Sequence, residues 1–182
     1  MKCLITGHTK GIGKSLYDAF VSMGFEVIGV SRSNGYDLSE RYQDIVALAE
    51  TCDLVINNAY CKDYQTRLLK DLAGKTKIIS IGSIAGYYSS SVLKKKEYCL
   101  NKSQLITETK KLSFHHDVLV INVSLTENAS SDPGCTYKDI FNICNHWIDN
   151  TNFSVVDFSV KLSTTNLKLI EDDFGLTLKD FL

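Results

Sequence analysis

The chain of 182 residues is poor in the features that mark several classes of protein. It has one proline and one tryptophan, and its six cysteines form no Cys-x-x-Cys pair. No cysteine is combined with a histidine at the spacing of metal ligands. Without such pairs the sequence gives no basis for a metal site. We therefore expect free thiols in a reducing cytoplasm and no bound metal.

Long apolar runs and a charge excess are also missing. The apolar residues at the N-terminus end at Ile5, before the length of a signal-peptide core, and no run approaches the ~18 residues of a membrane span. The formal charge is −1, and 44% of the residues are hydrophobic. This composition is typical of a globular protein with no nucleic-acid-binding surface and no membrane partner.

Strand and helix patterns alternate along the chain, without a repeat or a linker. We predict strands over 1–5, 26–32, 53–59, 77–83, 118–124 and 153–158, and helices over 14–21, 41–50, 65–73, 95–112 and 137–148. Ser39 is the expected N-cap of the second helix. The alternation indicates a single α/β domain, spanning residues 1–182, in which helices cover both faces of a doubly wound parallel sheet.

The first strand leads into a turn with glycine at positions 7, 11 and 13. Glycine lets a chain turn sharply and lets backbone N–H groups approach a phosphate, and the helix that follows directs the positive end of its dipole to the same place. A P-loop is excluded, because the required glycine would stand at position 8, which is His8. The turn favours a dinucleotide, with an ordinary strand-to-helix connection as the alternative.

The end of the second strand predicts which dinucleotide is bound. In a doubly wound sheet this position faces the adenosine ribose, where an acidic residue would favour the free 2′-hydroxyl of NAD. Here the strand ends in Ser31 and Arg32, and the glycine turn contributes Lys10. Two cations at this position suit a 2′-phosphate, so we expect NADP(H) rather than NAD(H). Two solvated surface cations are the alternative.

A tyrosine and a lysine stand four positions apart in the fourth predicted helix. Tyr98 and Lys102 therefore project from one face of that helix. A neighbouring ammonium favours the phenolate and is expected to pull the pKa of Tyr98 down from its usual value near ~10. The hydroxyl of Ser83, at the end of an adjacent strand, could bind the same substrate oxygen. This arrangement predicts hydride transfer to a carbonyl carbon.

These motifs, in this order, resemble those of the short-chain dehydrogenase/reductase family. The matches to its TGxxxGxG turn, its NNAG motif, its active-site serine and its YxxxK motif are Thr6, Gly7, Gly11, Gly13, Asn57, Asn58, Ala59, Ser83, Tyr98 and Lys102. Asp37-Leu38 resembles the pair that contacts adenine in that family. The resemblance implies a Rossmann-type, three-layer fold of about six or seven strands and a homodimer or homotetramer.

The resemblance also implies roles for these residues. Tyr98 would be the general acid in reduction and the base in oxidation, Lys102 would lower its pKa and hold the nicotinamide ribose, and Ser83 would orient the substrate. The residues expected to bind the cofactor are Gly7, Thr9, Lys10, Gly11, Ile12, Gly13, Ser31, Arg32, Asp37, Leu38, Asn58, Ala59, Tyr98 and Lys102.

The chain departs from the family pattern at several points. Only five positions separate Arg32 from Asp37, so a helix and a strand of the family are expected to be missing. No asparagine lies within 62–76 to supply the family's fourth catalytic residue, so we expect a proton relay through water or poor turnover. Tyr60 replaces the fourth residue of the NNAG motif, and its ring is expected to narrow the cofactor cleft.

The sequence thus predicts a cytoplasmic NADP(H)-dependent oxidoreductase acting on a small carbonyl or alcohol substrate. The alternative is a dinucleotide-binding sensor or regulatory protein with little turnover. A sugar-nucleotide epimerase or dehydratase is less favoured, because those relatives usually have another glycine spacing and a larger C-terminal region. The tail over 161–182 could cover a sheet edge or a partner subunit.

Overall fold

The computed structural model describes residues 1–88, 94–126, 134–158, 172 and 175. Most of the predicted tail over 161–182 and most of the predicted 125–135 loop lie outside these residues. The elements in chain order are β1 (Lys2–Thr6), α1 (Gly11–Ser22), β2 (Glu26–Val30), the 3₁₀ helix η1 (Arg32–Asn34), α2 (Tyr42–Ala49), β3 (Leu54–Asn57), α3 (Tyr64–Leu72), β4 (Lys77–Ser83), the 3₁₀ helix η2 (Ile84–Tyr88), α4 (Lys96–Leu112), β5 (Val118–Val123), α5 (Tyr137–Asp149) and β6 (Val155–Asp157).

The six strands form one parallel sheet in the order β2-β1-β3-β4-β5-β6. From β1 the chain first adds β2 on one side and then returns to add β3 on the other. The strand order therefore reverses between β1 and β3, and a ligand crevice is expected outside the carboxyl ends of these strands. The prediction of a doubly wound parallel sheet is confirmed.

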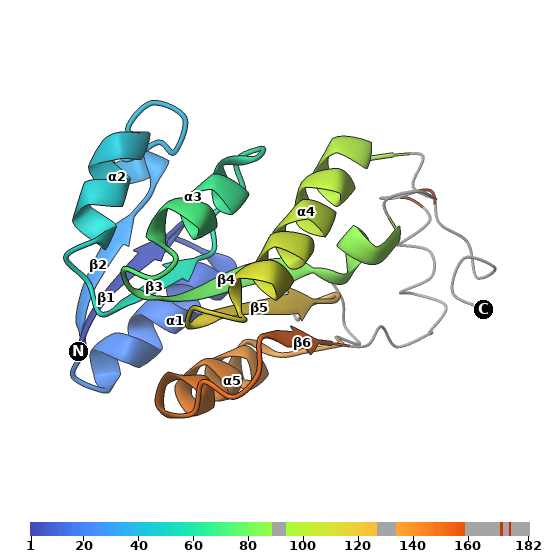
Figure 1. The fold of residues 1–182 in the computed structure, drawn as a ribbon. Helices are drawn as coiled ribbons and strands as arrows, with labels where there is room; N and C mark the ends of the chain where they lie inside the picture. Colours follow the sequence, from blue (N-terminus) through green and yellow to red (C-terminus); the bar gives the residue numbers. More distant parts are fainter. Residues whose placement is uncertain (89–93, 127–133, 159–171, 173–174, 176–182) are drawn as a thin grey trace.

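Helices cover both faces of the sheet, with α2, α3 and α4 on one side and α1 and α5 on the other (Figure 1). The period of two along β1 divides its side chains between these layers. Cys3 and Ile5 belong to the cluster packed by α1 and α5, whereas Leu4 belongs to the cluster packed by α2, α3 and α4. All three side chains are fully buried, so β1 has a core on each face.

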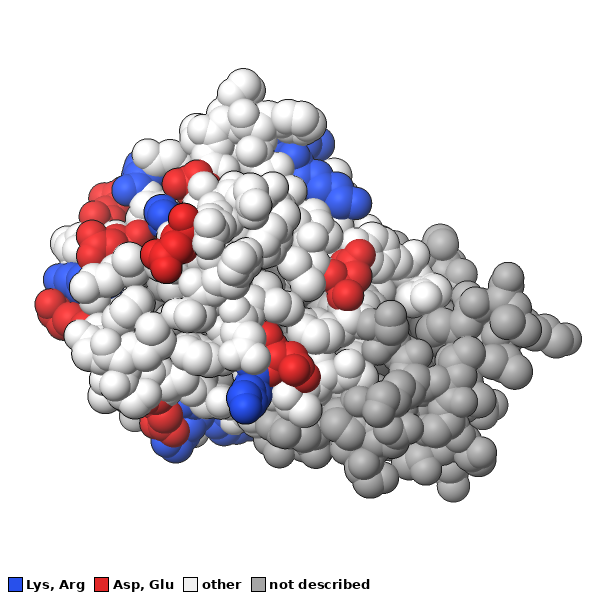
Figure 2. All heavy atoms as spheres, turned by 90° about the horizontal axis from the view of Figure 1, so that it is seen from below, with Lys and Arg blue, Asp and Glu red and all other residues white. Residues whose placement is uncertain are grey.

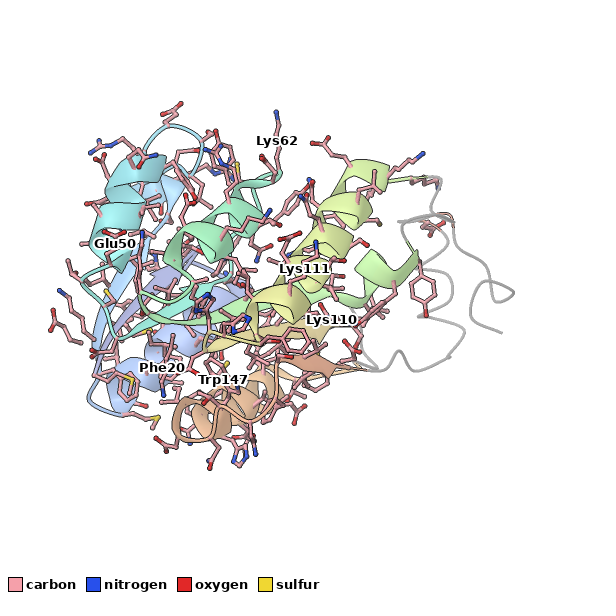
Figure 3. All side chains as sticks on the ribbon, viewed as in Figure 1. Phe20, Glu50, Lys62, Lys110, Lys111 and Trp147 are labelled. Atoms are coloured by element: carbon pink, nitrogen blue, oxygen red, sulfur yellow. The ribbon has the colours of Figure 1, made fainter. Side chains whose placement is uncertain are left out.

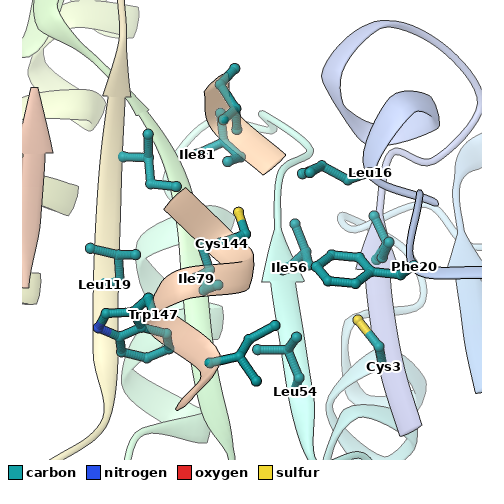
Figure 4. Close-up of a cluster of buried hydrophobic side chains, with 14 of the residues drawn as sticks. Cys3, Leu16, Phe20, Leu54, Ile56, Ile79, Ile81, Leu119, Cys144 and Trp147 are labelled. Atoms are coloured by element: carbon teal, nitrogen blue, oxygen red, sulfur yellow. The ribbon is translucent and has the colours of Figure 1, made fainter. Parts of the chain in front are cut away.

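The layer formed by α1 and α5 has an aromatic core. Trp147 of α5 and Phe20 of α1 both lie on this side of the sheet (Figure 3), and the close-up places Leu119, Ile79 and Ile56 among them (Figure 4). Trp147 is 1% exposed, and its indole N–H donates to the carbonyl oxygen of Phe153 at 2.8 Å. This bond satisfies the only polar atom of a side chain that is otherwise buried.

The connection from β2 to β3 is short, as the spacing predicts. After β2 the chain passes through η1 and α2, and the next strand, β3, pairs with the opposite side of β1. In the described sheet β2 is therefore an edge strand. The prediction of Ser39 as N-cap is wrong, because α2 begins at Tyr42. The Ser39 backbone N–H and hydroxyl instead donate to Asp37 Oδ1, at 2.8 and 2.5 Å, within the preceding turn.

The face that carries α1 and α5 has acidic and basic side chains of both signs around a wide uncharged area (Figure 2). None of the helices in the described part of the chain is both long enough and apolar enough to cross a membrane.

Candidate active site

The glycine turn is built by close contact between backbone atoms. Gly7 and Gly11 have φ values of 71° and 56°, in the left-handed region that favours glycine. A Cβ atom at Gly13 would lie 2.2 Å from the carbonyl oxygen of Gly7, so only glycine lets the start of α1 approach the turn. Lys10 at the N-cap makes no side-chain cap hydrogen bond. The first N–H groups of α1 can therefore bind an anion.

The Asn-Asn-Ala motif at the end of β3 holds this turn in place. Thr6 Oγ1 accepts hydrogen bonds from the backbone N–H groups of Asn58 and Ala59, both at 2.9 Å. The Asn58 amide in turn donates to the carbonyl oxygens of Thr6 at 3.0 Å and Gly7 at 3.3 Å. These bonds join the carboxyl ends of β1 and β3, the two strands between which the strand order reverses.

A cavity of about 700 Å³ lies beside this junction. Nine of the residues predicted to bind the cofactor line it, namely Gly7, Thr9, Lys10, Ser31, Arg32, Asp37, Leu38, Asn58 and Ala59. Of the remaining predicted residues, Gly11, Ile12 and Gly13 form the first turn of α1. The structure therefore brings most of the predicted cofactor site to one cavity at the carboxyl ends of β1, β2 and β3.

The loop that carries Arg32 is held by a small polar network. Asn34 Oδ1 accepts from the backbone N–H of Ser31 at 2.8 Å, and the Asn34 amide donates to the carbonyl oxygen of Gly29 at 2.8 Å. The hydroxyl groups of Ser31 and Ser33 are 2.8 Å apart. Across the cavity, hydrogen bonds from Ser39 hold the pKa of the Asp37 carboxyl below its usual value, and the charge of Arg32 adds to this effect.

Ser83 and Tyr98 meet at the same edge of the sheet, further along it. Ser83 is the last residue of β4 and is 8% exposed, and its hydroxyl is hydrogen-bonded to the phenol of Tyr98. Burial raises the pKa of Tyr98, and the bond to Ser83 lowers it by less. The net shift of this pKa is upward, contrary to the downward shift expected from Lys102. In this conformation the phenol therefore holds its proton, as a general acid requires.

Lys102 lies one helical turn from Tyr98 and is fully buried. Its ammonium donates to Gln65 Oε1 at 2.7 Å and to the carbonyl oxygen of Ile81 at 2.8 Å. The Nζ atom is 5.6 Å from the centroid of the Tyr98 ring and 5.6 Å from that of the Tyr60 ring. Burial lowers the pKa of Lys102 to about 7, because the charged form is taken out of water.

Solved structures share this arrangement of strands and helices. A 3-ketoacyl-(acyl-carrier-protein) reductase from Brucella melitensis complexed with NADH matches with a TM-score of 0.69 and 14% identity, over 86% of this chain and 95% of that chain. A small-chain dehydrogenase in complex with NADPH matches with a TM-score of 0.67 and 18% identity, over 87% and 96%. The chain has a short-chain dehydrogenase/reductase-like fold. No protein-family model and no curated protein sequence matches it.

Another structure with this fold, a short-chain dehydrogenase from Sphingobium yanoikuyae in complex with NADPH, matches with a TM-score of 0.63 and 15% identity, over 86% of this chain and 87% of that chain. All three matches span most of both chains, so the short-chain dehydrogenase/reductase-like fold is retained although β2 and β3 are joined by a short connection.

Within this fold the sequence analysis missed Gln65. It lies in the first turn of α3, is 2% exposed, and accepts the hydrogen bond from Lys102 directly. Its amide N–H₂ donates to the carbonyl oxygens of Asn57 at 2.7 Å and Ile81 at 2.9 Å. The signal was present in the sequence, since Gln65 precedes Leu68, Leu69 and Leu72 on the buried face of α3. A polar residue on an apolar stripe needs an internal partner.

Tyr60 lies between the cavity and the residues that the sequence predicts to be catalytic. Its ring packs edge-on against Tyr98 with centroids 4.9 Å apart, and its hydroxyl accepts from the Asn101 amide at 3.2 Å. Tyr60 also lines the cavity, whereas Ser83, Tyr98 and Lys102 are not among the described residues that line it. The ring is therefore a wall between the two parts of the site.

None of the six cysteines forms a disulfide, and five of them are buried. Burial raises the pKa of Cys144 to about 12, and also raises that of Cys3. Cys61 is partly exposed and lines the cavity beside Tyr60. No group of three or more His, Cys, Asp and Glu side chains suited to a metal ion occurs in the described part of the chain.

Proposed function

We propose that this protein is an NADP(H)-dependent oxidoreductase that transfers a hydride between a nicotinamide and a carbonyl or alcohol group. The observation that carries the proposal is the meeting of two sites at one edge of the sheet. The glycine turn with its cavity lies at the ends of β1 and β3, and Ser83 with Tyr98 lies at the end of β4.

The residues present fit a dinucleotide. The free N–H groups at the start of α1 and the absence of a Cβ at Gly13 suit a diphosphate. Lys10 and Arg32 on the cavity wall suit a 2′-phosphate, which supports NADP(H) over NAD(H). Solved structures with this fold are described as complexed with NADH or NADPH.

Residues of this chain would transfer the proton and orient the substrate. NADPH, when bound, supplies the hydride for the carbonyl carbon. The Tyr98 hydroxyl donates its proton to the carbonyl oxygen, and the Ser83 hydroxyl donates a hydrogen bond to the same oxygen. In the reverse direction the Tyr98 phenolate accepts the proton of the alcohol. Gln65 holds the amine of Lys102, and this amine lies against the Tyr98 ring and would keep it in position.

We also propose that the substrate is a small molecule and that the protein assembles as a homodimer or homotetramer. The cysteines, none of which is in a disulfide, support a cytoplasmic location.

A second candidate function is a dinucleotide sensor without turnover. The contact of the Lys102 amine with two aromatic rings favours it, since the amine is not open to a ligand in this conformation.

Tyr98→Phe separates these functions. We expect NADPH oxidation in the presence of a panel of aldehydes and ketones, and we expect Tyr98→Phe to abolish it while NADPH binding, measured by fluorescence, is retained. Binding by the wild type with no turnover of any substrate would favour the sensor. If the wild type binds neither NADPH nor NADH, the proposal fails.

Cofactor preference is tested by the pair Lys10→Ala and Arg32→Ala. We expect the double variant to weaken NADPH binding far more than NADH binding, because only NADPH carries the 2′-phosphate. An equal loss for the two cofactors would contradict the assignment of these cations.

A further inference from the structure

Tyr60 stands where two parts of the site meet. On one side it lines the cavity that contains the glycine turn and Arg32. On the other side its ring contacts Tyr98 and lies over the amine of Lys102. A ligand that extends from the cavity to Tyr98 along this side would contact the Tyr60 ring.

The amine of Lys102 belongs to a buried residue in this conformation. Gln65 Oε1 and the Ile81 carbonyl oxygen accept two of its three N–H groups, and the rings of Tyr60 and Tyr98 each lie 5.6 Å from Nζ. A ribose hydroxyl can reach this amine only if one of the rings moves. Tyr98 is tied to Ser83, so the ring that can move is that of Tyr60.

Within the described part of the chain, the contacts that hold Tyr60 are few and weak. The residue is 42% exposed, and its hydroxyl accepts a hydrogen bond from the Asn101 amide at 3.2 Å. The edge-on contact with Tyr98 and the contact with the amine are single aromatic interactions. The loop that follows contains Lys62 with φ at 44°, a value that is uncommon outside glycine. The ring can therefore swing away at a modest cost.

We propose that Tyr60 is a specificity-determining wall of the cofactor cleft. It leaves the half that receives an adenosine phosphate open and closes the half in which a nicotinamide ribose would meet Lys102. An adenine nucleotide that ends at its phosphates binds without moving the ring, whereas a complete dinucleotide binds only to the fraction of molecules in which the ring has moved. This inference rests on the proposed function, because it takes the cavity to be the adenosine half of a dinucleotide site.

The experiment compares two ligands in three proteins. Adenosine 2′,5′-bisphosphate fills the open half only, and NADPH spans both halves. Calorimetric titrations of the wild type, Tyr60→Ala and Tyr60→Phe give both affinities. Tyr60→Phe is the matched control, because it keeps the ring and loses only the hydrogen bond to Asn101.

We expect Tyr60→Ala to bind NADPH about tenfold more tightly than the wild type, with the affinity for the bisphosphate unchanged. In the wild type only the molecules in which the ring has moved can bind NADPH, whereas in Tyr60→Ala all molecules can. Tyr60→Phe should resemble the wild type for both ligands. Unchanged or weaker NADPH binding by Tyr60→Ala would overturn the inference, since the ring would then be neutral or a stacking surface for the ligand.

A second measurement needs no nucleotide. An amine acylating reagent should modify Lys102 about tenfold faster in Tyr60→Ala than in the wild type or Tyr60→Phe, as read by peptide mass spectrometry, because opening is needed before the amine can react. Equal rates in all three proteins would overturn the inference. If neither nucleotide binds to any of the proteins, the proposed function fails, and the acylation rates still report whether Tyr60 closes over Lys102.

Discussion

The two halves of the cleft differ in where their polar groups are directed. In the cavity half, the N–H groups at the start of α1 and the side chains of Lys10 and Arg32 surround open space. In the proposed catalytic half, the amine of Lys102 is buried and bonded to protein atoms. The first half is preorganised for a ligand, whereas the second must rearrange before it can touch one. We therefore expect nucleotide binding and the proposed catalysis to be separable by mutation.

The largest effect is expected at the glycine turn. Gly13→Ala would bring a Cβ atom to 2.2 Å from the Gly7 oxygen and 2.6 Å from the Asn58 amide, so the turn must deform. We expect a loss of about 3 kcal/mol in the free energy of unfolding, measured with denaturant, and loss of nucleotide binding.

The control for Gly13→Ala is Gly24→Ala. Gly24 has a φ of 82° but open space around its Cβ position. We expect Gly24→Ala to lower the free energy of unfolding by about 1 kcal/mol, because alanine is disfavoured in the left-handed conformation, and to keep nucleotide binding. Equal effects of the two changes would contradict the role of close packing in the cradle.

The next effect concerns the buried network around Lys102 in the proposed catalytic half. Gln65→Leu removes one acceptor of Lys102 and the two donors to Asn57 and Ile81, and we expect it to lower the free energy of unfolding by about 2 kcal/mol. It should also lower the pKa of Lys102 further, because the amide oxygen favours the charged amine.

Gln65→Glu sharpens the same test. A carboxylate beside Lys102 favours the ammonium, so the pKa of Lys102 should rise rather than fall. Lys102 makes the free energy of unfolding rise with pH only above its pKa in the folded protein. We therefore expect this rise to begin at a higher pH in Gln65→Glu than in the wild type. If both Gln65 variants leave the pH dependence of unfolding as it is in the wild type, Gln65 does not act on the amine.

Lys102→Met tests the buried amine itself. The pKa of Lys102 is about 7 when folded and near its usual 10.5 when unfolded. Between these values the unfolded chain binds more protons, so this group makes stability rise with pH, by up to ~1.4 kcal/mol per pH unit. Below pH ~7 both states are protonated and the slope vanishes.

We expect the pH dependence of the free energy of unfolding in Lys102→Met to lack this rise, as measured by denaturant titrations at several pH values. The difference between the two proteins isolates Lys102 from the buried thiols, which titrate in both. Parallel curves for the wild type and Lys102→Met would mean that the amine is not desolvated.

The smallest effect is expected from Lys14, which follows the glycine turn. Its amine is bonded to Asp18 one turn further along α1, at 2.6 Å from Oδ2, and both side chains are more than half exposed. Lys14→Ala should change the free energy of unfolding by about 0.3 kcal/mol and leave nucleotide affinity within twofold. A large loss of affinity in isothermal titrations would restore a P-loop-like role for this lysine.

The parts of the site that could be predicted from the sequence are those fixed by local geometry. Gly7, Gly11 and Gly13 are needed where the backbone turns or packs closely, and residue type alone reports this. The end of β4 at Ser83 and the common face of Tyr98 and Lys102 follow from strand and helix periods. The short connection after β2 follows from spacing.

What could not be predicted depends on contacts between distant segments. The pKa of Lys102 results from burial by α3, β4 and the Tyr60 loop, and spacing along α4 carries no information about these neighbours. The bond between Gln65 and Lys102 joins residues 37 positions apart. The misplaced N-cap at Ser39 has a similar cause, since its hydroxyl binds a carboxylate within the turn.

The distribution of thiols allows the native chain to be labelled at one cysteine. Five sulfur atoms are enclosed by the core, whereas Cys61 stands at the rim of the cavity next to Tyr60. A fluorophore attached through maleimide chemistry would therefore label one position without any engineered substitution. Its emission would register both nucleotide arrival and the swing of the neighbouring ring, so occupancy and motion could be followed in a single molecule.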